Sequence, residues 1–259
     1  MLNLAIPIST LLLLLLLWTT PLRADVACDG TDDSVGTGVN LSVFMSDTVG
    51  TYMLWYKSTG TPRSSGPGCA FGEFLLGFST TDSYAQISRH NNHLGNGPRL
   101  CTTGFDSDYR DVSSPFTANA WTHLAAVHTG GNLLLYKDGT LAGSVALGAI
   151  ASTSRALTMC GGNGAAVFNG EGVFTAVQVF PTALTAQEIA VIAQSRLHRV
   201  ATSVASGTWD FAACGDGVAC SGLVFTDRSG NNRPFTAGAA GTGGTGRGGE
   251  FVGYPWGVE

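Results

Sequence analysis

Three aspartates in one short polar stretch come nearest to the spacing of a metal site. Asp106, Asp108 and Asp111 fall within the six residues D-S-D-Y-R-D. Calcium prefers hard oxygen ligands, and carboxylates at this density suit it. The spacing predicts a calcium site in a loop, although aspartates in solvated turns also accept hydrogen bonds from the local backbone. A second and lesser candidate is the acidic cluster Asp29, Asp32 and Asp33.

Side chains of the kind that bind sugars gather in the same part of the chain. Sites for small ligands combine apolar and aromatic surface with a few convergent polar groups. The candidate ligand-binding residues are Tyr84, His90, Asn92, His93, Tyr109 and Arg110. The alternative is that these positions form ordinary surface loops, and Arg89 to Pro98 is predicted to be a loop too polar to bury. A zinc site at His90 and His93 is disfavoured, because no third ligand is in sight.

The motifs of common catalytic centres are missing from the sequence. Glycoside hydrolysis needs two carboxylates about 5–10 Å apart, which the spacing E-x-D-x-E would place on one face of a strand. The chain has no such run, and its glutamates are scattered: Glu73, Glu171, Glu188, Glu250 and Glu259. G-x-S-x-G and H-E-x-x-H are also absent. The sequence therefore favours a non-enzymatic protein.

The charge of the chain and its N-terminal segment limit the expected binding partners and cellular location. Only 12% of residues are charged and the net charge is −5, so nucleic acid and anionic membrane surfaces are poor partners. Residues 1–24 contain a leucine run at 11–17 and end at Ala24, which predicts a secretory signal peptide and an extracellular protein. A retained signal anchor is the alternative. After cleavage no membrane association is expected.

Six cysteines follow that segment, which suits an exported chain with three disulfides. They are Cys28, Cys69, Cys101, Cys160, Cys214 and Cys220. Six cysteines allow 15 pairings. The short separation of the last two favours a local bridge between Cys214 and Cys220.

Local patterns predict the elements that would position such sites. Residues 121–128 carry apolar side chains on both faces, which indicates a central strand with a layer on each side. Asp138-Gly139 fits a two-residue type I′ hairpin loop, which requires positive φ at both residues. Thr185-x-x-Glu188 is a capping box that begins one short helix. Leu184 and Ile189 flank it with the spacing of a hydrophobic staple.

Two long motifs resemble a known family. W-T-H-L-A-A-V-H-T-G-G-N-L-L-L-Y-K-D-G at 121–139 and F-N-G-E-G-V-F-T-A-V-Q-V-F-P-T-A-L-T-A-Q-E-I at 168–189 resemble signatures of laminin G-like, concanavalin A-like jelly-roll domains. C-D-G-T-D-D-S-V at 28–35 resembles the run near the family's start. The resemblance implies an all-β, two-sheet antiparallel jelly-roll sandwich over 25–206, with one short helix. Trp121 would anchor its core and Tyr136 would pack beside it.

The C-terminal segment 207–259 resembles the family's N-terminal strands, which normally precede the D-G-x-D-D run. Its matching features are T-W-D-F, D-R-S-G-N and G-G-E-F-V-G. One hypothesis is a circular permutation in which this segment completes the same sandwich, because chain termini commonly lie close together. The other is a truncated second repeat.

Together these features predict a secreted, non-enzymatic recognition module that binds carbohydrate or extracellular protein, with calcium assisting. The alternatives are a glycoside-active enzyme of the concanavalin A-like fold and a structural component of a wall or matrix.

Overall fold

The computed structural model describes most of the chain from residue 26 onward. The described ranges are 26–30, 35–59, 73–80, 83–92, 95–103, 108–111, 115–150, 156–161, 170–194, 205–209, 224–225, 227–232, 234–237 and 250–251. The predicted signal segment, His93, Asp106 and the cysteine pair Cys214 and Cys220 lie outside these ranges. Among the described residues, no helix is long and apolar enough to span a membrane.

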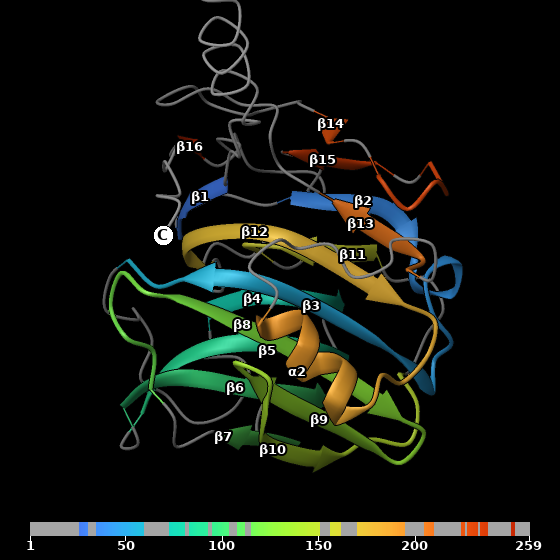
Figure 1. Ribbon diagram of the computed structural model, residues 1–259, viewed down its shortest axis with the longest axis horizontal. Helices are drawn as coiled ribbons and strands as arrows, with labels where there is room; N and C mark the ends of the chain where they lie inside the picture. The colour runs from blue at the N-terminus through green and yellow to red at the C-terminus, as the bar shows by residue number, and fades with distance from the viewer. Residues whose placement is uncertain are drawn as a thin grey trace, which may run out of the picture.

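The chain forms two antiparallel sheets packed face to face, which confirms the predicted sandwich (Figure 1). In order across it, the first sheet contains β10 (Thr140–Ala146), β9 (Asn132–Lys137), β8 (Trp121–Thr129), β3 (Val49–Lys57), β12 (Glu171–Phe180), β1 (Val26–Asp29) and β16 (Glu250–Phe251). A further strand, β13 (Gly207–Trp209), pairs with β12. The second sheet contains β14 (Val224–Phe225), β15 (Phe235–Ala237), β2 (Val35–Asn40), β11 (Ala156–Met159), β4 (Glu73–Thr80), β5 (Ser83–Asn92), β6 (Gly95–Thr103) and β7 (Asp108–Asp111).

The main core lies between the two sheets and is rich in aromatic side chains. Tyr52 packs edge-on against Phe78 of the opposite sheet, with ring centroids 5.5 Å apart. Such contacts contribute about 0.5–1.5 kcal/mol beyond the burial of area. The largest fully buried side chain is Trp209, on β13. Fully buried aromatic rings are therefore supplied by strands from both ends of the chain.

The expectation for Trp121 is wrong. Trp121 is only partly buried, at the start of β8, where the Lys57 ammonium lies 5.3 Å from the centre of its ring. Tyr136 is buried, but in a second apolar cluster under the helix rather than between the sheets. The predicted layer on each face of β8 is confirmed, because Leu124 and Ala126 join the main core while Ala125 and Val127 join this second cluster.

The second cluster exists because helix α2 (Ala186–Gln194) lies across the outer face of the first sheet (Figure 1). Its predicted capping box is confirmed: the Thr185 amide donates to Glu188 Oε2 at 2.7 Å, and the Glu188 amide donates to Thr185 Oγ1 at 3.3 Å. Ile189 and Ile192 point into the cluster. The helix packs on the predicted hairpin turn, where Gly139 has φ +82° and a Cβ would lie 2.9 Å from the Ala190 Cα.

Arg89 to Pro98 is not the predicted loop. It forms the end of β5 and the start of β6, with Arg89 paired with Pro98 and Asn92 with Gly95. The side chain of Arg89 is fully buried, and Pro98 is buried as well. Arg89 can be buried because its guanidinium is paired inside the sandwich.

Strands from the C-terminal segment join both sheets. Trp209 of β13 pairs with Val177 of β12, and β16 pairs with β1 at the edge of the first sheet. In the second sheet, Thr236 of β15 pairs with Gly36 of β2. Figure 1 shows these orange and red strands at the end of the sandwich occupied by the blue β1 and β2.

One disulfide crosses between the sheets in the described part of the chain. Cys28 on β1 of the first sheet is bonded to Cys160, which follows β11 of the second sheet. The pairing of Cys214 with Cys220 stays a prediction.

Candidate functional site

An open groove of about 620 Å³ lies near the point where β12 ends. This volume is within the usual range of sites for small ligands. The residues that line it come from four separate parts of the chain: Ser42, Val43, Phe44, Met45, Ser46, Asp47, Pro181, Ala205, Ser206 and Asn231. They present hydroxyl, carboxylate and amide groups among small apolar ones, a mixture that can hydrogen-bond a polar ligand and also contact its carbon skeleton.

The first wall of the groove is the segment 42–47, which a short 3-10 helix, η1 (Leu41–Val43), turns away from β2. The Phe44 amide donates to the Leu41 carbonyl at 2.8 Å. Ser46 Oγ then accepts the Val49 amide at 2.8 Å, which fixes the entry into β3. Ser42, Val43 and Asp47 remain exposed on this wall. The wall is therefore a fixed turn with solvent-facing side chains.

The second wall is built by a turn at 227–231 that is tied to β13. One carboxylate oxygen of Asp227 accepts the amides of Thr208 at 3.1 Å and Ser229 at 2.8 Å. Asn231 Nδ2 donates to the Ser206 carbonyl at 3.2 Å, so its amide group is held at the rim of the groove. The D-R-S-G-N run is thus a hydrogen-bonded turn that positions Asn231 beside Ser206.

The two walls meet at an aromatic contact. Trp209 packs edge-on against Phe44, with ring centroids 5.6 Å apart and an interplanar angle of 68°. Trp209 is fully buried and Phe44 is 1% exposed. Because Phe44 itself lines the groove, this contact fixes the first wall against the strand that carries the second.

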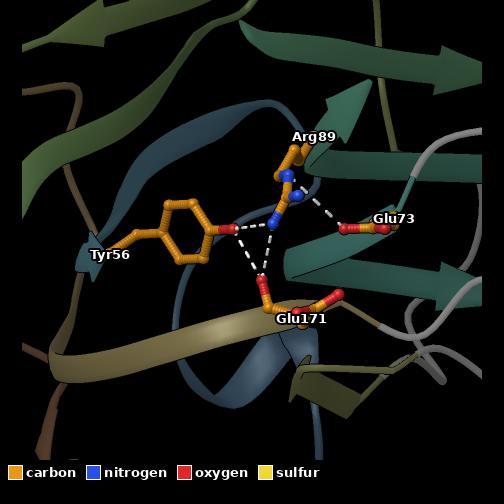
Figure 2. Close-up of polar contacts among 4 residues, drawn as sticks. All are labelled: Tyr56, Glu73, Arg89 and Glu171. Carbon is orange, nitrogen blue, oxygen red and sulfur yellow. Dashed lines mark hydrogen bonds and ion pairs between the residues drawn. The ribbon is translucent and has the colours of Figure 1, made fainter. Parts of the chain in front are cut away.

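A buried polar network lies at the other end of β12 (Figure 2). Arg89 Nη1 donates to the Tyr56 hydroxyl at 2.8 Å and to the Glu171 carbonyl at 2.9 Å, and Arg89 Nε lies 3.6 Å from Glu73 Oε2. The Tyr56 hydroxyl also donates to the Glu171 carbonyl, at 2.6 Å. Tyr56 and Glu171 belong to the first sheet, whereas Glu73 and Arg89 belong to the second.

This network is suited to joining the sheets rather than to binding a ligand. The side chains of Tyr56, Glu73 and Arg89 are at most 2% exposed. Burial raises the pKa of Tyr56 to about 12, although the adjacent Arg89 guanidinium lowers it in part. The phenol is therefore a neutral hydrogen-bond donor at any physiological pH.

The structure spreads the predicted sugar-binding residues along two strands. Tyr84 lies near the start of β5 and Asn92 at its end, about 26 Å apart at the usual rise of a strand. His90 pairs with Gly97, while Tyr109 and Arg110 lie on β7, paired with Cys101 and Leu100. Tyr84 and Asn92 therefore do not share one rim, and His93 lies outside the described residues.

The predicted metal ligands are described only in part. Asp108 and Asp111 are the first and last residues of β7, so this portion is a strand rather than the expected loop. Within the described part of the chain, no three His, Cys, Asp or Glu residues come together as a possible metal site. Asp106 lies outside that part, and calcium stays a hypothesis.

The sequence did not point to the groove, because its lining is spread over some 190 positions. The strongest signal that could have found it is the D-R-S-G-N run, a turn sequence rich in short polar side chains. That run resembles a segment near the N-terminus of the family's domain. It does not indicate which other part of this chain lies beside it in the fold.

The family follows from the fold and a sequence comparison together. The model of the concanavalin A-like lectin/glucanases superfamily matches residues 29–190, more than half of the chain. The chain belongs to this superfamily. The matched residues include the first wall of the groove, at 42–47, and Pro181. The match ends before Ser206 and Asn231, which also line the groove. No curated protein sequence matches the chain.

Solved structures share the superfamily fold at low sequence identity. A putative carbohydrate binding protein from Bacteroides ovatus is 13% identical with a TM-score of 0.56, over 84% of this chain and 58% of that one. The native heptameric SAP-like pentraxin from Limulus polyphemus is 14% identical with a TM-score of 0.54, over 69% of this chain and 85% of that one. At these sequence identities the similarity establishes the fold and does not establish a ligand or an activity.

Proposed function

We propose that this protein is a secreted, non-enzymatic module that binds carbohydrate. One observation carries the proposal: the groove is open and rich in hydrogen-bonding groups, yet Asp47 is the one carboxylate among the described residues that line it. Hydrolysis of a glycosidic bond requires two carboxylates flanking that bond. The groove can therefore hold a polar ligand without the pair of groups needed to cleave it.

Three other carboxylates in the described part of the chain have structural roles. Glu73 is buried against Arg89, and Glu188 caps helix α2. Asp227 accepts backbone amides in the turn of the second wall. The membership of a superfamily that contains both lectins and glucanases admits either activity, and the use of these carboxylates favours binding.

A glycan array probed with the full secreted protein tests the function. We expect selective retention of a subset of glycans, and an array on which nothing is retained would overturn the proposal. Turnover of any retained glycan that survives purification and is lost in Asp47→Asn would replace the binding module with a glycoside-active enzyme.

Calcium assistance through Asp106, Asp108 and Asp111 is tested on the same array. Retention that falls in the presence of a chelator and returns with added calcium would support it. Unchanged retention would remove calcium from the proposal and leave carbohydrate binding intact.

Secretion is tested separately by sequencing the N-terminus of the exported protein, which we expect to begin at Asp25.

A further inference from the structure

We propose that the groove binds a short neutral oligosaccharide and that its affinity depends on the docking of the C-terminal segment, because that segment supplies one wall. This inference rests on the proposed carbohydrate-binding function and deepens it. It assigns the binding site and the class of saccharide. It also states that affinity depends on residues that follow the family match, which ends at residue 190.

The charge of the lining selects the class of saccharide. Asp47 contributes a negative charge, and the other described residues that line the groove are neutral. The protein as a whole also has a net charge of −5. A uronic, sialic or sulfated sugar would place its own negative charge near Asp47, and none of the described lining residues is a lysine or arginine that could offset the repulsion. A neutral sugar can instead donate its hydroxyl groups to this carboxylate.

The chemistry of the rim also fits a neutral sugar. Ser42 and Asp47 from the first wall line the same groove as Ser206 and Asn231 from the second. Hydroxyl and amide groups can both donate and accept hydrogen bonds, as sugar hydroxyls do. Val43, Pro181 and Ala205 supply apolar surface between them for the carbon-bound hydrogens of a pyranose ring.

The coupling follows from the origin of the two walls. The family match over 29–190 contains residues 42–47 and Pro181, whereas Ala205, Ser206 and Asn231 follow it. The later residues are held in place by Asp227 and by the packing of Trp209 on Phe44. A ligand that contacts both walls binds only the docked form, so any undocking lowers its apparent affinity in proportion.

A groove-filling substitution tests the site with little effect on the fold. Val43 is 40% exposed and lines the groove, while Val191 is 54% exposed on helix α2 and does not line it. We expect Val43→Trp to weaken binding of a neutral oligosaccharide by about tenfold or more, a loss of about 1.4 kcal/mol or more in binding free energy. The matched Val191→Trp control should bind like the wild type. Equal binding by all three proteins would overturn the site while leaving carbohydrate binding itself intact.

A positioning residue tests the coupling. Asp227 does not line the groove, and Asp227→Ala removes the oxygen that accepts the Thr208 and Ser229 amides. We expect a loss of affinity on the order of threefold to tenfold. Asp227→Asn, which keeps an acceptor oxygen, should restore most of it. Thr185→Ala, which removes a helix cap and does not change a residue that lines the groove, controls for a general loss of stability and should leave affinity unchanged.

The outcomes are distinguishable by calorimetry or by array binding with neutral, sialylated and uronic acid-containing oligosaccharides. If the wild type binds no glycan, the proposed function fails. If it binds acidic glycans in preference to neutral ones, the class of saccharide is wrong. If Val43→Trp abolishes binding and Asp227→Ala does not change it, the groove is the site but the coupling is wrong.

Discussion

The Arg89 guanidinium on β5 donates a 2.8 Å hydrogen bond to the Tyr56 hydroxyl on β3, across the interior of the sandwich. Both side chains are fully buried. A buried charge is costly unless it is paired and hydrogen-bonded. Here Glu73, Tyr56 and the Glu171 carbonyl supply those partners (Figure 2).

Tyr56→Phe should therefore destabilise the protein. The substitution keeps the ring but removes a hydrogen bond to a charged group, which contributes about 1.5–3 kcal/mol. Urea denaturation of the purified protein would measure the change. Tyr52→Phe on the same strand is a matched control, because the buried Tyr52 hydroxyl has no hydrogen-bond partner within the described part of the chain. Its removal should be close to neutral, and equal losses in both variants would contradict this role of the network.

Trp209→Ala should be strongly destabilising. The indole is fully buried between the sheets and contacts Phe44. Replacing a core tryptophan by alanine typically costs about 3–5 kcal/mol through lost burial and the cavity left behind. Thermal unfolding compared with the wild type would detect this loss, and a change within the scatter of surface substitutions would show that β13 is dispensable to the core.

Deletion of residues 207–259 tests whether the C-terminal segment completes the sandwich. We propose that it does, as a circular permutation, since its strands pair with β12, β2 and β1. The shortened protein should be poorly secreted or melt at a clearly lower temperature. A protein that is secreted normally with unchanged thermal stability would favour a dispensable, truncated repeat.

Thr185→Ala should weaken helix α2. Thr185 Oγ1 accepts the Glu188 amide and donates to the Glu188 carboxylate. Loss of such a cap costs about 1 kcal/mol. The neighbouring Thr182→Ala is a suitable control, because Thr182 is exposed and contributes its backbone carbonyl to the hydrogen bond from Thr51. Chemical denaturation should separate the two variants.

His128 should make stability depend on pH. Burial lowers the pKa of its imidazole, although the Leu147 carbonyl and Asp47 partly oppose this shift. The unfolded state therefore takes up a proton first, at a pH near the ordinary histidine pKa of about 6.5. Stability from this residue is fully present above that pH and is lost as pH falls toward the lower pKa of the folded state.

Urea midpoints measured at several pH values would check this effect. His128→Gln should have a flatter profile than the wild type between neutral pH and pH 5. Parallel profiles would show that protonation of His128 is not linked to unfolding.

Local sequence rules predicted the elements that depend on neighbouring residues alone. The Asp138-Gly139 turn has φ values of +50° and +82°, as a type I′ turn requires. The capping box at 185–188 is also present as predicted. Both features are specified by a few consecutive residues, so they can be predicted without knowledge of tertiary contacts.

The expectations that failed depended on tertiary context. The period of strand β8 identified two apolar faces but could not show that Trp121 lies at a strand end, beside Lys57. Likewise, Arg89 was expected in a polar loop because its partners Tyr56 and Glu171 lie far away in the sequence. The groove could not be assembled for the same reason, since its walls meet through Trp209 and Phe44, which are far apart in the sequence.

The bond between Cys28 and Cys160 has a mechanical consequence. It joins β1, the first strand in chain order, to the opposite layer across 132 positions of chain. A force applied near residue 26 can separate the pairs of Val26 and Ala27 with β12, after which the disulfide at Cys28 passes the load into the second sheet. A protease that nicks the chain between the two cysteines would likewise leave the fragments covalently attached. The two parts of the chain should therefore stay attached after pulling or a single cleavage until a reductant reaches this bridge.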